Sequence, residues 1–360
     1  MHFFSQKIIK LFVFVVILFS PVLVFAVSQA ACIFLLIEQG SRSGGMGQAY
    51  VAQVDDAYAG WWNPGAMAFN RKNQLALMHS NWFGDVAGID DMYIEYLAWN
   101  NYFESMQGNL GFHIIYLTYG EQDLMDEQGE WLGTFTSFEV ATAATYAYQY
   151  SDNLGLGITF KIIYSDLAPD GGPSSTQTTK GRGISFAFDL GLLKKNLLLR
   201  GLDLGLNLQN IGPDITYIDK DQADPLPMNF RLGLSYRLLE SDLNKFTING
   251  EMSKELATQS DPLHQRLLTG WSEGGADGPF LKRVIDSTIF SVGAEYTYWN
   301  FLSMRGGYFY DKAGHIQGLA FGAGIQYTFT NKYKAKFDFA FQPAGELTDY
   351  NKTFSLGIDF

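Results

Sequence analysis

The last eleven residues constrain the fold more than any other stretch, because hydrophobicity alternates along them with a period of two. Side chains of a β-strand point alternately to its two faces, so this pattern predicts a strand with one apolar and one polar face. The apolar face carries Tyr350, Phe354, Leu356, Ile358 and Phe360, with Lys352 near its start, and the other face carries Asn351, Thr353, Ser355, Gly357 and Asp359.

The same alternation recurs back to residue 74, and connections between the alternating segments are by turns short and long. Short connections include 151–152 and 330–332, and long ones include 165–181 and 255–286. Short turns on the periplasmic side and long loops outside are the rule for bacterial outer-membrane barrels, which have even strand numbers. We therefore expect about fourteen strands, at 74–82, 91–99, 108–119, 134–150, 153–164, 182–193, 201–210, 227–239, 245–254, 287–299, 301–310, 316–329, 333–342 and 350–360.

The two faces of these segments differ in a way that favours a membrane barrel over a soluble β-sandwich. Leu, Phe and Tyr gather on one face, while the opposite face carries glycine and charge, as at Asp203, Gly205 and Arg231. The chain has 29 Phe, 20 Tyr and 38 Gly, which fits a lipid-facing exterior around a tight polar interior. We predict an all-β fold, a transmembrane outer-membrane β-barrel of about 14 antiparallel strands, with outer-membrane lipid around it.

The N-terminus predicts export. Lys7 and Lys10 precede an apolar run over 11–27, and small residues follow it, as in a signal peptide, which we place at 1–30. An uncleaved anchor is the alternative, but the run is short for a spanning helix and Pro21 interrupts it. Cys32 could accept a lipid, but Gln29 stands where a lipoprotein signal has a bulky aliphatic residue. Cys32 is the chain's one cysteine, so an internal disulfide is excluded.

Residues 38–70 lack the alternation. They contain three clusters instead: a glycine-rich cluster at 42–47, an acidic cluster at 55–57 and a turn-forming cluster at 62–64. No strand–loop–helix frame or Gly-Lys-Ser/Thr motif accompanies the glycines, which argues against phosphate binding. The glycines instead favour close packing of the backbone in a confined space, and Asn-Pro-Gly predicts a turn. We expect a plug segment over 31–73, inside a barrel over 74–360. Its motif residues are Arg42, Gly44, Gly45, Met46, Gly47, Asp55, Asp56, Trp62, Asn63 and Pro64.

These three clusters resemble the N-terminal signature of the PorV/PorQ family of outer-membrane proteins, and the terminal Phe360 resembles the end that barrel-insertion machinery recognises. The resemblance implies a FadL-like barrel of fourteen strands with this segment inside it as a hatch. Members are associated with type IX secretion, either receiving secreted cargo from the translocon or acting in surface attachment. The chain departs from the family in having Gly65-Ala66 where Ala-Gly is usual. The signature covers about 30 residues, and the remainder matches in pattern.

No catalytic, cofactor or metal motif stands out in the sequence. We find no nucleophile elbow, no His-Glu metal pair and no Cys-X-X-Cys, so we predict no enzyme, no cofactor and no metal site. The acidic loop over 121–130 lacks the spacing of a calcium loop. A net charge of −12 without clustered Lys and Arg argues against a nucleic-acid partner. Charges predicted to face the lumen, such as Lys161 and Glu295, are expected to form ion pairs, because buried charges must be paired; a polar pathway is the alternative.

Two functions therefore remain open. In the first, the barrel binds secreted cargo or the translocon through its outer loops. The loop 255–286 is the candidate partner surface, because Leu267, Leu268, Trp271 and Phe280 are apolar residues on a long connection. In the second, the barrel is a FadL-like channel for hydrophobic small molecules, which requires a movable hatch and an apolar pocket near the outer rim. The glycine-rich, charged inner faces disfavour the channel mildly.

Overall fold

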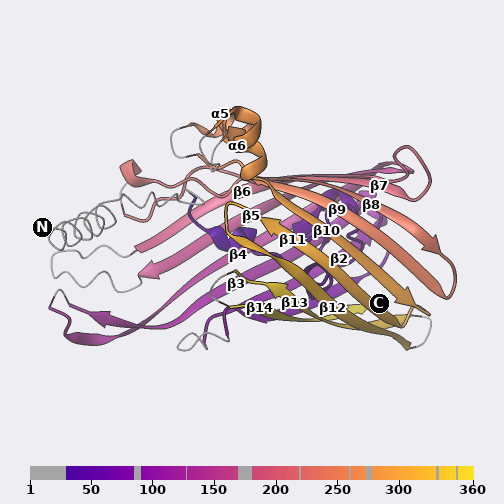
Figure 1. Cartoon of the computed structure of the whole chain (residues 1–360), viewed down its shortest axis with the longest axis horizontal. Coiled ribbons are helices and arrows are strands. Elements are labelled where there is room, and N and C mark those ends of the chain that lie inside the picture. Colours follow the sequence, from indigo (N-terminus) through magenta and orange to yellow (C-terminus); the bar gives the residue numbers. More distant parts are fainter. Residues whose placement is uncertain are drawn as a thin grey trace, which may run out of the picture.

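A closed antiparallel barrel of fourteen strands forms the bulk of the protein (Figure 1). The computed structural model describes residues 30–360 except 85–90, 127, 169–180, 219, 259–260, 273–277, 330–331 and 346–347. Each strand pairs with its neighbours in sequence, and β1 pairs with β14 to close the barrel. The strands are β1 (Gln74–Asn81), β2 (Tyr93–Phe103), β3 (Gly108–Met125), β4 (Trp131–Ser151), β5 (Leu154–Ala168), β6 (Gly181–Lys194), β7 (Leu202–Ile211), β8 (Asn229–Glu240), β9 (Asn244–Glu255), β10 (Ile289–Tyr298), β11 (Leu302–Asp311), β12 (Ile316–Phe329), β13 (Tyr333–Pro343) and β14 (Tyr350–Asp359).

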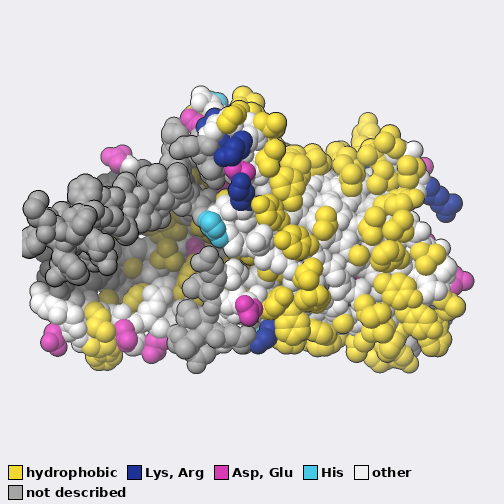
Figure 2. All heavy atoms as spheres, in the orientation of Figure 1, with side chains coloured by type: hydrophobic (Ala, Val, Ile, Leu, Met, Phe, Trp, Pro, Cys, Tyr) yellow, Lys and Arg dark blue, Asp and Glu magenta, His cyan; other side chains and the backbone are white. Residues whose placement is uncertain are grey.

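The strand register places the apolar faces on the outside, as predicted. Leu356 of β14 lies opposite Leu77 of β1 and Phe337 of β13, and all three side chains are exposed on the outer surface. Ser355 and Asp359 point inward and are buried. Figure 2 shows the result as a broad area of hydrophobic side chains across the visible face of one part of the barrel. The predicted fold class, an all-β outer-membrane barrel, is confirmed.

Short turns lie at the end of the barrel where β1 begins and β14 ends. There Asn73 and Phe360 exchange two backbone hydrogen bonds, of 2.9 and 3.2 Å, which extend the closing strand pair. By the rule for outer-membrane barrels, this is the periplasmic end. At the opposite, outer end, β3 and β4 are longer than predicted, with 18 and 21 residues. Their outer parts follow a register shift between Thr118 and Glu121 and extend beyond the regular apolar alternation from which the strands were predicted.

The N-terminal segment, residues 30–73, lies within the barrel (indigo in Figure 1) and contains only short helical turns. Its largest side chains, including Trp61, Trp62 and Met46, are fully buried. The first strand begins at Gln74, where the sequence placed the start of the barrel. The predicted signal peptide falls almost entirely outside the described residues. The helical turns are η1 (Ile33–Leu36), α2 (Ser41–Gly44), α3 (Ala59–Trp62) and α4 (Pro64–Met67).

A small helical excursion lies between β9 and β10 at the outer end of the barrel (orange in Figure 1). It consists of α5 (Leu263–Thr269), the single turn η4 (Gly270–Ser272) and α6 (Phe280–Asp286). Two other single turns are η2 (Glu104–Met106) and η3 (Lys220–Gln222). None of the helices in the described part of the chain has the length and apolarity needed to cross a membrane.

Candidate functional site

Glycines on the inner faces of the strands form the seat on which the N-terminal segment rests. A Cβ atom added at Gly205 of β7 would lie 2.2 Å from the carbonyl oxygen of Val51, and one at Gly293 of β10 would lie 2.3 Å from that of Met46. Such approaches are far inside van der Waals contact, so only glycine fits. The segment contributes a glycine of its own: Gly45 faces the backbone of Gly322, and its added Cβ would lie 2.8 Å from the Gly322 Cα. The expected close backbone packing is thus present.

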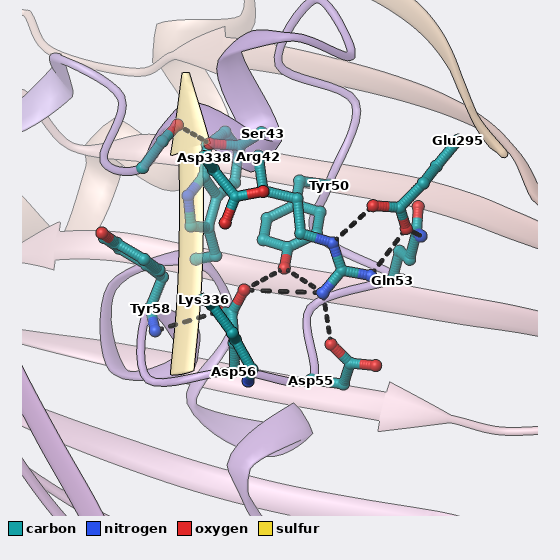
Figure 3. A network of polar contacts seen from close by, with 12 residues as sticks. Arg42, Ser43, Tyr50, Gln53, Asp55, Asp56, Tyr58, Glu295, Lys336 and Asp338 are labelled. Carbon is teal, nitrogen blue, oxygen red and sulfur yellow. Dashed lines mark hydrogen bonds and ion pairs between the residues drawn. The ribbon is translucent and has the colours of Figure 1, made fainter. Parts of the chain in front are cut away.

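Arg42, at the second position of α2, joins the N-terminal segment to the barrel wall (Figure 3). Its Nε and Nη2 donate to both carboxylate oxygens of Glu295 on β10, at 2.9 and 2.7 Å. Its Nη1 donates to the Asp55 carboxylate and, at 3.0 Å, to the hydroxyl of Tyr50. The Tyr50 hydroxyl in turn donates to Asp56 at 2.6 Å. A bidentate guanidinium–carboxylate pair is among the strongest polar contacts available to a protein.

The wall side of this cluster is also paired. Arg305 of β11 donates from Nε to Glu295 at 2.7 Å and from Nη1 to Asp338 of β13. Gln53 donates to the same Glu295 carboxylate at 2.6 Å. One carboxylate therefore binds two arginines and an amide, and it connects the N-terminal segment with β10 and β11. The predicted lumenal ion pairs are present here, and also as Lys161–Asp189, Arg231–Glu251, Arg237–Asp203 and Lys336–Asp359.

The two adjacent acidic residues of the segment respond oppositely to this cluster. The side chain of Asp55 is 72% exposed to a cavity in the lumen; desolvation there works to raise its pKa, but the Arg42 guanidinium outweighs this, and the net shift is downward. Burial raises the pKa of Asp56, and Arg42 offsets this only in part. The difference has a geometric origin, because Arg42 donates directly to Asp55 but lies 3.5 Å from the nearest Asp56 oxygen. Asp55 therefore stays ionised to a lower pH than Asp56 does.

The Asn-Pro box forms a second anchor at the other end of the segment. The side chain of Asn63 accepts from the backbone N–H of Gly65 at 3.0 Å, capping α4, and donates to the carbonyls of Val51 and Leu192 at 2.8 and 3.0 Å. Pro64 is the first residue of α4, where its missing N–H costs nothing. The turn predicted from Asn-Pro-Gly is therefore present, and its asparagine also binds β6 of the wall.

Two tryptophans next to this box are fixed from the wall. Asn207 of β7 donates to the carbonyls of Trp61 and Trp62, at 3.1 and 2.9 Å. The guanidinium of Arg231 lies over both indole rings, with its central carbon 5.1 and 4.7 Å from the ring centroids. The indole N–H of Trp62 donates to the Gln39 carbonyl at 2.7 Å. Polar and cation–π contacts thus fix a large apolar pair in the lumen.

The predicted motif residues divide between these two anchors. Arg42, Asp55 and Asp56 meet in the first, and Trp62, Asn63 and Pro64 belong to the second. Gly44 instead faces Gln342 of β13. The sequence predicted Glu251 as an inward-facing charge of the wall but not its partners, and it did not predict the parts played by Tyr50 and Gln53. Glu251 accepts from the backbone N–H groups of Tyr50 and Val51 at 2.7 and 2.8 Å. No motif marks the pairing with Glu251, since this residue lies about two hundred residues further along the chain.

A cavity of about 580 Å³ lies beneath the N-terminal segment, towards the periplasmic end. Its roof includes Arg42, Asp55 and Asp56, and its walls include periplasmic strand ends such as Asp203 and Asp359. Most of its lining residues are polar or charged. Towards the outer end, the residues of η1 join the apolar core, where Phe34 and Leu35 are fully buried. The large cavity therefore suits polar solutes or peptides better than hydrocarbons.

The candidate partner loop has an open apolar surface, which we call the outer helical surface: Leu267, Leu268, Phe280, Leu281 and Ile285. Leu268 is 80% exposed and Leu281 67% exposed. Trp271 does not belong to it, because its ring packs edge-on against Phe230 of β8, with centroids 5.3 Å apart. Below the surface, Arg266 is buried and ion-paired with Asp214 at 2.7 Å. The sequence indicated Leu267, Leu268, Phe280 and Leu281 as apolar residues of this loop, but not Ile285, which lies one helical turn after Leu281 in α6.

Solved structures of similar fold define the class of barrel. The match to the Pseudomonas putida toluene transporter TodX covers 89% of this chain and 97% of TodX, with 14% sequence identity and a TM-score of 0.53. CymD, a monoaromatic hydrocarbon channel, gives 13% identity and a TM-score of 0.54, covering 90% of this chain and 97% of that one. The match to the Ralstonia pickettii toluene transporter TbuX has 13% identity and a TM-score of 0.52, and it covers 91% of this chain and 98% of TbuX. The protein is an outer-membrane β-barrel with the fold of these hydrocarbon channels.

Its family is more specific. The model of the type IX secretion system protein PorV matches residues 25–261, which include the N-terminal segment and the strands up to β9. The chain belongs to the PorV family. No curated protein matches it. Neither this family nor the hydrocarbon channels are enzyme families.

Proposed function

We propose that this barrel acts in type IX protein secretion by binding a secreted cargo protein or a surface-attachment partner at its outer end. The outer helical surface carries the proposal, because five apolar side chains stand exposed on a folded excursion outside the regular lipid-facing strands. Exposed apolar clusters of this kind mark interaction sites. Membership of the PorV family supports the connection with secretion.

The N-terminal segment acts in this proposal as a closed hatch. Two anchors bind it to the wall, one around Arg42 and one around Asn63, and glycines beneath it leave no space between backbones. A plugged lumen leaves the outer loops as the working surface. Binding to the secretion translocon would use the same end of the molecule, and the role is binding rather than catalysis.

The test is capture of partners from outer membranes solubilised in mild detergent, with a tag on the barrel and mass spectrometry of the bound proteins. Replacing Leu268→Asp together with Leu281→Asp should remove most of the captured protein, because these are the two most exposed side chains of the outer helical surface. Leu198→Asp is the matched control, since Leu198 is 84% exposed but lies in a periplasmic turn. Equal capture by the double variant and the control would contradict the proposal.

The second candidate function is uptake of hydrophobic small molecules, favoured by the fold shared with TodX and CymD. It requires the N-terminal segment to move, which would break the Arg42–Glu295 pair. The charged lining of the large cavity weighs against it. Mass spectrometry of small molecules extracted from the purified barrel tests it: a stoichiometric apolar ligand, with no protein captured, would favour uptake.

A further inference from the structure

The periplasmic cavity is basic, in contrast to the chain as a whole. Nine cationic and seven acidic side chains line it, whereas the full sequence carries a net charge of −12. Every one of the seven carboxylates lies within 4.0 Å of a cation that also lines the cavity. Only five cations take part in these pairs. The lining as a whole therefore carries a net charge of +2, and four of its nine cations have no carboxylate within ion-pair distance among the described residues.

The four are Arg71, Lys195, Lys245 and Lys334, none of which is ion-paired with a carboxylate among the described residues. Neutral groups hold two of them in place. The Arg71 guanidinium lies 4.2 Å from the ring centroid of Tyr102, and the Lys195 ammonium lies 4.1 Å from that of Phe69. The other two occupy the second residues of β9 and β13.

These four cations surround the periplasmic mouth. Arg71 contacts the periplasmic end of β4 through Gln149, and Lys195 lies in the turn between β6 and β7. Lys245 and Lys334 lie on the inward faces at the starts of β9 and β13, because Lys245 pairs in register with the inward Thr297 and Lys334 with the inward Asp359. The mouth therefore presents separated positive charges, and apolar side chains such as Phe69 and Leu193 also line the cavity.

We propose that this mouth is a docking site for an acidic, extended peptide segment of a periplasmic protein. Carboxylates spaced along such a segment can each meet one of the separated cations, and its intervening apolar side chains can contact the apolar part of the lining. A cavity of about 580 Å³ is in the range of ligand-binding pockets and admits a few residues of peptide. A single small anion could satisfy only one or two of these cations. The site lies opposite the outer helical surface and does not depend on its role.

The experiment uses the mature barrel in nanodiscs of zwitterionic phosphatidylcholine. A fluorescein-labelled decapeptide of alternating Asp and Ala is titrated, and anisotropy is recorded at low and physiological salt. The same peptide with Asn for Asp, and one with Lys for Asp, are the peptide controls. Lys195→Gln, Lys245→Gln and Lys334→Gln are combined as the test variant. The protein control combines Lys282→Gln with Lys312→Gln, which removes lysines at the outer end.

We expect saturable binding of the Asp peptide alone, weakened by about tenfold or more in the triple variant, unchanged in the outer-end control, and weakened by salt. Three results would overturn the proposal. They are no saturable binding, equal binding by the triple variant, or displacement of the peptide by free succinate or phosphate at the same anion concentration. The last would assign the mouth to small anionic solutes.

Discussion

Gly205 shows how little space separates the N-terminal segment from the barrel wall. Replacing Gly205→Val should destabilise the barrel by about 1–3 kcal/mol, because the added carbons overlap the backbone at Val51. Thermal unfolding and proteolysis of the segment are the measurements. Gly250→Val is the matched control on β9, two strands away from β7 in the barrel, since an added Cβ there meets nothing within 4 Å. Similar losses in both variants would show that β-sheet geometry, rather than the seat, sets the requirement for glycine.

Arg42 is the residue whose loss should matter most in the segment. Replacing Arg42→Ala removes one of the two arginines that pair with the buried Glu295, and it removes the arginine beside Asp55 and Asp56. The free energy of unfolding should fall by about 3–5 kcal/mol. Arg42→Lys should recover only part of this, because an ammonium cannot form the bidentate pair. Denaturant unfolding of the purified barrel measures both. Wild-type stability in the alanine variant would mean that the other anchors hold the segment alone.

Asp55 gives the same cluster a defined response to acid. Its folded-state pKa is lower than its ordinary value of 3.8, so its stabilising effect is complete above that value and is lost as the pH falls through the lowered pKa. We expect the segment to become protease-sensitive only below about pH 4. Asp55→Asn should make the segment less firmly held at neutral pH and flatten its dependence on acid. An unchanged acid profile in that variant would assign the transition to another carboxylate.

At the scale of the strand, the outer face is tuned to lipid. Leu356 lies in the middle of β14 beside Leu77 and Phe337, and its side chain is 56% exposed. Leu356→Arg should destabilise the barrel by about 2–4 kcal/mol if the residue lies near the bilayer midplane, because a guanidinium then enters hydrocarbon. Folded and unfolded fractions after titration with urea in lipid vesicles give the change in the free energy of unfolding. Ser355→Ala, on the inner face of the same strand, should change it much less.

The strands were predictable from sequence because each one repeats the same physical rule, apolar towards lipid and polar towards the lumen. The outer extension of β3 past Thr118 was not, since strand pairing continues there after a register shift. Among the site residues, Arg42 and Asn63 stood out through local motifs. Their partners Glu295 and Leu192 did not, because strand register decides which wall residues meet the segment. Sequence thus indicates which residues are buried charges but not which pair they form.

For the whole molecule, the decisive question is whether the segment must move. Ser41 and Ser355 have hydroxyl oxygens 2.9 Å apart, so Ser41→Cys with Ser355→Cys, in a Cys32→Ala background, should form a disulfide between segment and wall. If the barrel works closed, the oxidised variant should capture partners as the reduced one does. The disulfide should also raise the free energy of unfolding by about 2–4 kcal/mol, so that the oxidised variant unfolds at a higher denaturant concentration. Capture that fails on oxidation and returns on reduction would show that opening is required.

The glycine seat also has a consequence for how the molecule is made. The backbone of the segment touches the strands closely, and the bulky side chains of Trp61 and Trp62 are fully buried, so entry into an already closed barrel would require the wall to separate from its close contacts. We therefore expect it to lie in place before β14 joins β1. The segment precedes every strand in the chain, so the strands can assemble around it and use it as a template. Chain order then becomes assembly order, and a barrel that closed too early would be empty.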